Sequence, residues 1–311
     1  MGFVALVFAL LIEQGWPLSP RNWVHLAVTQ LADMVKRATD AGESRYGVIG
    51  WFLVIGILVA AAIVLNWLAD RLHPVAVFCF YVLVLYWTVG FRQFSHAFSE
   101  IQISLAANDL PAARTVLQEW LQRRNPDIVV AEAPVNEVCR LAISHALVAA
   151  HRHVFGPLFW FILLPGAVGP VLYRVAQLLE ERWHEHNEPY GVWAQRAYWV
   201  LDWLPLRMSA AGFAVVGNFE DAVYSWRGAV ATGTGGEQRA LLLATGGGAL
   251  GLRVADPELE ARWTAAEQGV DWLGVEPTPE ALRSAVGLVW RSVVLWLALL
   301  GMLTIASWLG N

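Results

Sequence analysis

The sequence predicts an all-α, polytopic integral membrane protein with about four to six membrane helices and further interfacial amphipathic helices. Three observations lead to this fold class. Hydrophobic residues make up 57% of the 311 residues and charged residues only 15%, whereas a globular chain carries about 25% charged residues. The run Tyr46–Leu68 contains no charged residue. The chain also has 17 tryptophans, a residue that is enriched at membrane–water interfaces.

The first two elements are an apolar run and an amphipathic helix. Gly2–Ile12 is apolar but shorter than the roughly 20 residues that cross a bilayer, so we expect a membrane-dipping helix or part of a first span. Arg21–Arg37 places its apolar residues at helical spacing. This pattern favours a helix that lies on the membrane surface.

The clearest membrane element is a hairpin over residues 46–90. Tyr46–Leu68 predicts one span, Arg71–Pro74 a tight turn, and His73–Gly90 the return span. Five residues of the first span recur at helical spacing and predict a face for helix packing, with the glycine allowing close approach: Ile49, Phe52, Leu53, Gly56 and Ile57.

Two polar helices are expected after the hairpin. Phe91–Asn108 predicts an interfacial helix, and Asp109–Arg123 predicts a soluble amphipathic helix. Asn108 or Asp109 is the expected N-cap, because a short polar side chain accepts a hydrogen bond from a free backbone N–H at that position. Arg124–Pro134 is expected to be a loop.

The stretch from Asn136 to Arg174 carries the main functional signal. Its first half has helical periodicity, and its second half is an apolar run that six residues are expected to break: Gly156, Pro157, Pro165, Gly166, Gly169 and Pro170. In a membrane, irregular backbone persists only where it is buried in protein or lines a watery cavity. Broken segments of this kind are the usual place for a polar ligand.

Helical spacing from Pro134 puts an acid, a base, a hydroxyl and an imidazole on one stripe: Glu137, Arg140, Ser144 and His151. Together with Arg152, this stripe predicts a polar wall that binds an anionic or amide-bearing ligand. Ionisable groups near a membrane span are functional more often than elsewhere. The alternative is a solvated face that holds a Glu137–Arg140 ion pair.

Asp202 and Arg207 flank Pro205 in a nearly apolar segment. A charged group in hydrocarbon costs on the order of 2.5–3.5 kcal/mol. We therefore expect these side chains to pair with each other, with the central stripe, or with cavity water. A structural ion pair and a ligand contact are the two interpretations.

The histidines and glycines do not form known motifs. Five histidines invite a metal hypothesis, but their spacing separates them on a helix and no HExxH pattern occurs: His145, His151, His153, His184 and His186. We predict no metal site. The glycine-rich runs Thr232–Glu237 and Thr245–Gly251 fit neither a phosphate loop nor a dinucleotide fingerprint, and they predict turns and close helix packing.

The remaining chain alternates between polar and apolar segments. Val175–Glu188 is strongly charged, Tyr190–Gly217 is apolar again, residues 254–284 form an acidic soluble segment, and Ala285–Leu309 predicts a final span. Whether residues 155–171 and 198–217 fully cross the membrane stays open. We expect one membrane domain over residues 1–311.

Several motifs resemble the CobD/CbiB proteins over residues 106–253. They are GPLFW (Gly156–Trp160) followed by LYR (Leu172–Arg174), an AxDLxxAR helix start (Ala107–Arg114), a segment ending in Pro-x-Arg (Asp202–Arg207), and GGALGLR (Gly247–Arg253). The resemblance implies a membrane enzyme that joins aminopropanol, or its phosphate, to cobyric acid late in cobalamin assembly. ATP and a divalent metal would be needed for that activity.

Other features resemble the related AmpE-like proteins. The acidic, amide-rich run that CobD/CbiB proteins carry before PLFW falls on Val148–His153, which reads VAAHRH, and their Asn-Thr-x-Asp motif falls on Gln177–Glu180. Leu11–Glu13, Arg152 before PLFW, and Leu201–Arg207 are similar to AmpE-like segments. That resemblance implies an inner-membrane regulatory or sensory component linked to β-lactamase induction and wall recycling.

The first functional hypothesis is therefore an AmpE-like regulatory, sensory or ligand-binding protein without synthase activity. Its ligand candidates are Arg140, Ser144, His151, Arg152, Asp202 and Arg207. The alternative is an adenosylcobinamide-phosphate synthase in which Glu137, Gln177 and Glu180 replace the missing acidic groups. A second alternative is a structural membrane partner.

The expected surroundings follow from the composition and the resemblances. We expect a multi-pass protein of the bacterial inner membrane whose partners are the lipid bilayer, a polar or anionic small molecule, and a membrane or wall-recycling protein. A net charge of −5 gives no electrostatic basis for nucleic-acid binding. No resident cofactor is predicted outside the synthase alternative.

Overall fold

The structure is a computed structural model that describes residues 2–16, 22–122, 129–184, 189–231, 238–255 and 274–309. The described residues form helices and no strand, with one isolated bridge between Leu252 and Val275. Three helices are long and apolar enough to cross a membrane, namely Ser44–Leu72, Val135–Leu163 and Ala281–Ala306, and two shorter helices are also apolar. The predicted all-α membrane fold is confirmed.

The chain divides into two compact units. The first unit comprises Met1–Gln93 and His153–Pro205, and the second comprises Phe94–Arg152 and Leu206–Asn311. Each unit combines segments that are distant in the sequence. The expectation of a single domain stays a prediction.

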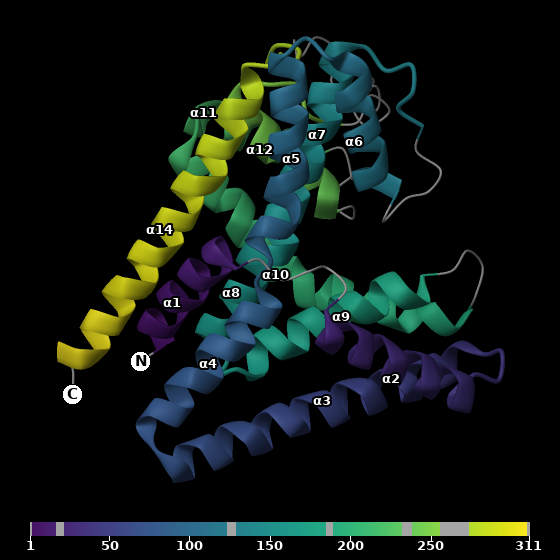
Figure 1. Ribbon diagram of the computed structural model, residues 1–311, viewed down its shortest axis with the longest axis vertical. Coiled ribbons are helices and arrows are strands. Elements are labelled where there is room, and N and C mark those ends of the chain that lie inside the picture. Colours follow the sequence, from purple (N-terminus) through teal and green to yellow (C-terminus); the bar gives the residue numbers. More distant parts are fainter. Residues whose placement is uncertain are drawn as a thin grey trace. The chain divides into compact units, whose positions relative to one another are not determined.

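The first unit contains the predicted hairpin (Figure 1). α1 (Gly2–Gly15) packs against α4 (Pro74–Thr88), and α4 follows α3 (Ser44–Leu72) after one residue. That residue, His73, caps α4 because its Nδ1 accepts from the backbone N–H of Val75, and Pro74 occupies the first turn, where a missing N–H costs nothing. The two helices and the turn between them lie where the sequence predicts; α3 is long enough to cross a membrane, whereas α4 has only 15 residues, so a return span over His73–Gly90 stays a prediction.

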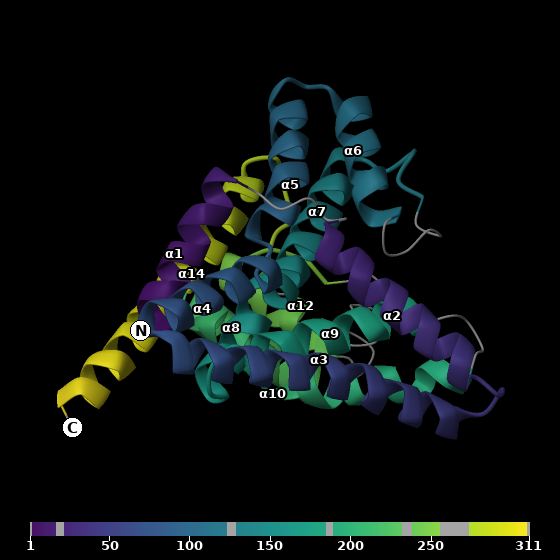
Figure 2. The same ribbon diagram turned by 60° about the horizontal axis from the view of Figure 1, so that its bottom comes forward.

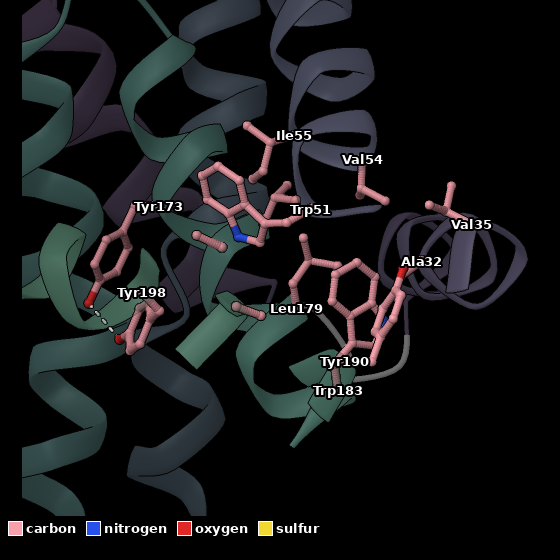
Figure 3. Packing of buried hydrophobic residues seen from close by; sticks show 13 residues of the cluster. Ala32, Val35, Trp51, Val54, Ile55, Tyr173, Leu179, Trp183, Tyr190 and Tyr198 are labelled. Atoms are coloured by element: carbon pink, nitrogen blue, oxygen red, sulfur yellow. Dashed lines mark hydrogen bonds between the residues drawn. The ribbon is translucent and has the colours of Figure 1, made fainter. Parts of the chain in front are cut away.

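The amphipathic helix α2 (Trp23–Thr39) begins at Asn22, whose side chain accepts from the N–H of His25. Figure 2 shows α2 meeting α3. Its apolar side packs into an aromatic core, drawn in Figure 3, that includes Ala32, Val35, Trp51 and Val54. This side of α2 is thus buried against α3 and α9.

The packing face that we expected on α3 was wrong. Ile49, Phe52, Leu53 and Ile57 are about half exposed, and a Cβ at Gly56 would meet no neighbouring atom within 4 Å. The buried face is instead the adjacent one, with Gly47, Gly50, Trp51, Val54 and Ile55. Helical periodicity cannot separate these two faces, because almost every residue of this span is apolar.

Helices from the segment His153–Pro205 complete the first unit. η1 (His151–Phe155) is a π-helical turn, α8 (Gly156–Leu163) continues it, and α9 (Val168–Trp183) returns along α8. A 3₁₀ turn, η2 (Pro189–Gly191), precedes α10 (Val192–Val216), which contains Pro205 and continues into the second unit.

The central stretch differs from the predicted broken run. The helix continues through Gly156 and Pro157, and the break comes later, between Leu163 and Val168, where Gly166 has φ +70°. Pro157 lies in the first turn of α8, and proline is tolerated at that position. α9 also begins seven residues before the charged segment that we expected to start at Val175.

The second unit is built around two buried helices. It contains α5 (Phe91–Ala106), α6 (Leu110–Gln122), α7 (Val135–Ala150), α11 (Phe219–Ala231), α12 (Gln238–Leu250) and α14 (Ala281–Leu309). α7 contacts α6, α12 and α14, and α12 also packs on α11. Asp109 caps α6 through the N–H of Ala112, as one of the two predicted caps.

The last segments were predicted only in part. The glycine run from Thr245 lies inside α12 as far as Leu250, and Gly251, with φ +66°, directly follows the helix. The run Thr232–Glu237 and most of the acidic segment 254–284 lie outside the described residues. The final predicted span is confirmed as part of α14.

Candidate functional site

The predicted stripe on α7 holds a neighbouring chain segment. The Arg140 guanidinium donates to both Glu137 oxygens, with Nε–Oε2 2.7 Å and Nη2–Oε1 2.6 Å, and its Nη1 donates to the carbonyl of Ala255 at 2.9 Å. Ser144 Oγ donates to the carbonyl of Val254 at 2.8 Å. Arg140 and Ser144 therefore fix the chain just after GGALGLR. Their role in ligand binding stays a prediction.

His151 ends the stripe in a buried position. Its Nδ1 lies 2.9 Å from Ser209 Oγ on α10, and both side chains are almost fully buried. Ser209 follows Arg207 by two residues, so the second unit brings the end of the stripe next to the segment that carries Arg207. Arg152 and Arg207 are half-buried. Whether they bind a ligand stays a prediction.

Asp202 belongs to a buried hydrogen-bond network in the first unit. Tyr173 on α9 donates to Asp202 Oδ1 at 2.7 Å, and the Tyr198 hydroxyl lies 3.0 Å from that of Tyr173, as the dashed line in Figure 3 marks. Burial raises the pKa of Tyr173 well above 10, and the negative charge of Asp202 raises it further. The Tyr173 phenol therefore stays protonated and donates to the carboxylate.

Gly156 of the GPLFW motif lies against this network. A Cβ at Gly156 would fall 2.3 Å from the Tyr173 ring and hydroxyl, so only glycine fits there without displacement. Three segments that carried the family resemblance thus meet in one place through Gly156, Tyr173 and Asp202. Sequence reasoning proposed Asp202 as a site residue, quoted Tyr173 only as part of the LYR motif and missed Tyr198, because tyrosines in an aromatic-rich chain do not stand out.

A second set of polar side chains links η1 to α9, and we call it the α9 hydrogen-bond chain: His153, Arg174, Gln177 and Glu181. Arg174 Nη1 lies 2.7 Å from His153 Nδ1 and donates to Gln177 Oε1 at 2.8 Å. Gln177 Nε2 donates to Glu181 Oε1 at 3.0 Å. Gln177 was a predicted site residue and is buried, whereas Arg174 was not predicted.

The α9 hydrogen-bond chain connects two segments that the sequence had singled out separately. His153 ends the segment Val148–His153, and Gln177 begins the segment Gln177–Glu180. Glu180 is half-buried beside them on α9. Hydrogen bonds from Arg174 to His153 and to Gln177 bring one residue of each segment together within the first unit.

The described residues offer no obvious metal or phosphate cradle. No three His, Cys, Asp or Glu side chains in the described ranges lie close enough to share a metal ion. His151 and His153 point to different partners, Ser209 and Arg174. Gly246–Gly248 lie inside α12, where a helix rather than a loop surrounds them. Whether a metal binds with the substrates stays untested.

Comparisons with known proteins give a consistent result. A family model described as CobD/Cbib protein matches residues 3–289. The chain is 29% identical to the cobalamin biosynthesis protein CobD of Stutzerimonas stutzeri over 96% of both chains. It is 32% identical to the CobD of Chromobacterium violaceum over 79% of this chain and 77% of the relative.

A more distant similarity agrees with these two. The cobalamin biosynthesis protein CbiB of Salmonella typhimurium is 26% identical over 69% of this chain and 68% of its own. No solved structure matches.

These relatives contradict the first functional hypothesis. An AmpE-like regulatory protein without synthase activity was expected because VAAHRH and QLLE replace acidic motifs. The similarity to proteins named for cobalamin biosynthesis nevertheless extends over nearly the whole chain. The expectation gave too much weight to two short segments, whose polar groups Arg174 joins by direct hydrogen bonds.

Proposed function

This chain belongs to the CobD/CbiB family, and we propose that it is an amide-forming enzyme of cobalamin biosynthesis, an adenosylcobinamide-phosphate synthase of the bacterial inner membrane. The observation that carries the proposal is the extent of the match. Relatives named cobalamin biosynthesis protein CobD align with this chain over most of both lengths. The family match over residues 3–289 includes the candidate site residues named above.

The reaction condenses a carboxylate of cobyric acid with the ammonium group of aminopropanol phosphate. An amide bond forms, and one carboxylate oxygen leaves with two ammonium hydrogens as water. Because this condensation is unfavourable in water, a co-substrate such as ATP, hydrolysed to ADP and phosphate, must drive it. No three His, Cys, Asp or Glu side chains lie together in the described ranges, and we assign no step to a metal.

Two features of the first unit support this assignment chemically. Arg174 carries a permanent positive charge in a half-buried position, and arginine is well suited to carboxylate and phosphate groups. The α9 hydrogen-bond chain and the Tyr173–Asp202 network hold their side chains in fixed orientations. A preorganised polar site of this kind reduces the cost of aligning two substrates.

The test is direct synthesis. Purified full-length protein in detergent is incubated with cobyric acid, aminopropanol phosphate, ATP and Mg²⁺, and the corrinoid product is identified by mass spectrometry. We expect a product heavier than the acid by the amine minus one water. Replacing aminopropanol phosphate with aminopropanol shows which amine is the substrate.

Complementation provides an independent check. The gene should restore corrinoid synthesis in a bacterial strain that lacks its own amide-forming enzyme for this step. Folded protein, judged by far-UV circular dichroism, that forms no amide with either amine and does not complement would contradict the proposed function.

A further inference from the structure

The last membrane helix of the second unit carries an arginine on its exposed face. Within α14, the stretch Ala281–Ala306 is long and apolar enough to cross a membrane. Arg291 lies inside this stretch and is exposed, as are Trp290 and Val294 beside it. A charged side chain that faces hydrocarbon is costly, so Arg291 requires an anionic or aqueous neighbour.

The length of α14 puts Arg291 at the edge of the hydrocarbon layer. From Ser292 to Leu309 the chain runs for 18 residues without a charged side chain, and at about 1.5 Å per residue this stretch is about 27 Å long. A bilayer has a hydrocarbon core of roughly 30 Å. The turns before Arg291, with the exposed Arg283 and Ser284, then lie among the lipid headgroups. An exposed tryptophan such as Trp290 is typical of that layer.

The Arg291 side chain is directed toward the same layer. Its Nε donates to the carbonyl oxygen of Gly287 at 3.2 Å, one helical turn nearer the start of α14. The side chain thus bends away from the uncharged stretch, as arginines near a membrane boundary do when they keep the charge out of hydrocarbon. A guanidinium has five N–H donors. Among the described residues, Arg291 makes no further hydrogen bond or ion pair, so its Nη hydrogens can reach an acceptor outside them.

Open space adjoins this guanidinium. A Cβ at Gly287 would meet no atom within 4 Å, so the helix surface beside the carbonyl that Arg291 contacts is uncovered. The other arginine of this face, Arg283, already interacts electrostatically with the Glu280 carboxylate. Arg291 is therefore the cation of this face that lacks an acid among the described residues. The fork of a guanidinium matches two oxygens of a phosphate.

We propose that Arg291 and the open space at Gly287 form a binding site for the phosphate of an anionic phospholipid. Anionic lipids are attracted to basic residues at the membrane surface. The acyl chains of such a lipid cover the exposed apolar residues that follow on the same face, Val294, Ala298 and Met302. The lipid thereby holds α14 at one depth in the bilayer. Binding of this kind does not require the proposed enzymatic activity.

Native mass spectrometry measures the binding. Full-length protein in detergent micelles is mixed with equal amounts of phosphatidylglycerol and phosphatidylcholine, and the lipids that remain bound are identified by mass. We expect preferential retention of phosphatidylglycerol. A basic residue near a membrane surface raises the affinity for anionic lipid about fivefold, so Arg291→Gln should lower this retention about fivefold. Arg291→Lys keeps the charge and should lose less.

Arg227→Gln is the matched control. Arg227 is likewise an exposed arginine of the second unit that follows a tryptophan, but α11 has only 13 residues and is not a candidate span. Retention of phosphatidylglycerol should stay at the level of the unsubstituted protein in this variant. Equal retention in Arg291→Gln and the unsubstituted protein, or an equal loss in Arg227→Gln, would overturn the site. Far-UV circular dichroism checks that each variant is folded.

A photoreactive side chain identifies what covers the face. p-Benzoylphenylalanine replaces the exposed Val294, and the protein is irradiated in vesicles of equal parts phosphatidylglycerol and phosphatidylcholine. We expect a mass gain of one phospholipid, with phosphatidylglycerol in excess, and loss of that excess when Arg291→Gln is added. A cross-link to a second copy of the chain, or within the chain, would show that protein covers this face and would refute the lipid site. Neither result depends on whether the protein forms an amide.

Discussion

Tyr173 should matter more for stability than Tyr198, although both are buried phenols in one network. Tyr173→Phe removes the donor 2.7 Å from Asp202 Oδ1 and leaves a buried carboxylate without that bond. A hydrogen bond to a charged group contributes about 1.5–3 kcal/mol, and the lost acceptor of the Tyr198 hydroxyl adds about 1 kcal/mol. Tyr198→Phe leaves the bond to Asp202 in place and should cost only about 0.5–1.5 kcal/mol.

The assay is unfolding by SDS in mixed micelles, followed by circular dichroism. A double-mutant cycle with Asp202→Asn separates the charge from the hydrogen bond, because asparagine keeps the shape and an acceptor oxygen. In that background the cost of Tyr173→Phe should fall by at least about 1 kcal/mol, as expected for coupled neighbours. Equal costs for the two tyrosines, or no coupling to Asp202, would refute the charge-assisted bond.

Two further predictions concern packing and pH. A Cβ at Gly248 would lie 2.5 Å from the carbonyl oxygen of Asp221, so Gly248→Ala should destabilise the protein by about 1–3 kcal/mol. Gly228→Ala, in open space on α11, should instead stabilise it by up to about 1 kcal/mol, and thermal unfolding distinguishes the two. The hydrogen bond from Arg182 holds the pKa of Asp33 below its ordinary value of 3.8. The ion pair therefore stabilises the fold fully above pH 3.8, and this stabilisation is lost as the pH falls through the lowered pKa of Asp33. Arg182→Met should therefore cost less than about 1 kcal/mol at pH 7, since the pair is partly exposed, and this cost should vanish as pH falls through the lowered pKa of Asp33; a difference that persists once Asp33 is protonated would contradict this assignment.

Local signals in the sequence predicted the elements that depend on local physics. The uncharged run predicted the first helix of the hairpin, and His73 with Pro74 predicted the turn at which α4 begins. Asp109 was one of two predicted caps for α6. These features need only a residue and its neighbours within one helical turn, so the sequence alone was sufficient.

Contacts between distant segments could not be predicted in the same way. On α3 two adjacent apolar faces are equivalent by periodicity, and the buried one is decided by Gly47 and Gly50, where Tyr190 lies against the helix. Likewise, Asp202 was expected to pair with Arg207, with the stripe or with cavity water, and the hydrogen bond that its Oδ1 accepts from a tyrosine on α9 was not foreseen. A neutral phenol next to a carboxylate leaves no charge pattern in the sequence.

The π-helical turn before Pro157 accounts for the continuation of the central helix through the proline, where the sequence had suggested a break. A proline in a helix interior removes one hydrogen bond and clashes with the carbonyl four residues earlier. Here that carbonyl belongs to His153, and the wider π-helical turn moves it away from the ring of Pro157 toward the N–H of Gly90. The backbone group that proline leaves unpaired is thus satisfied by the end of the hairpin, which membrane burial requires. Within the same turn, His153 Nδ1 lies 2.7 Å from Arg174 Nη1 on α9.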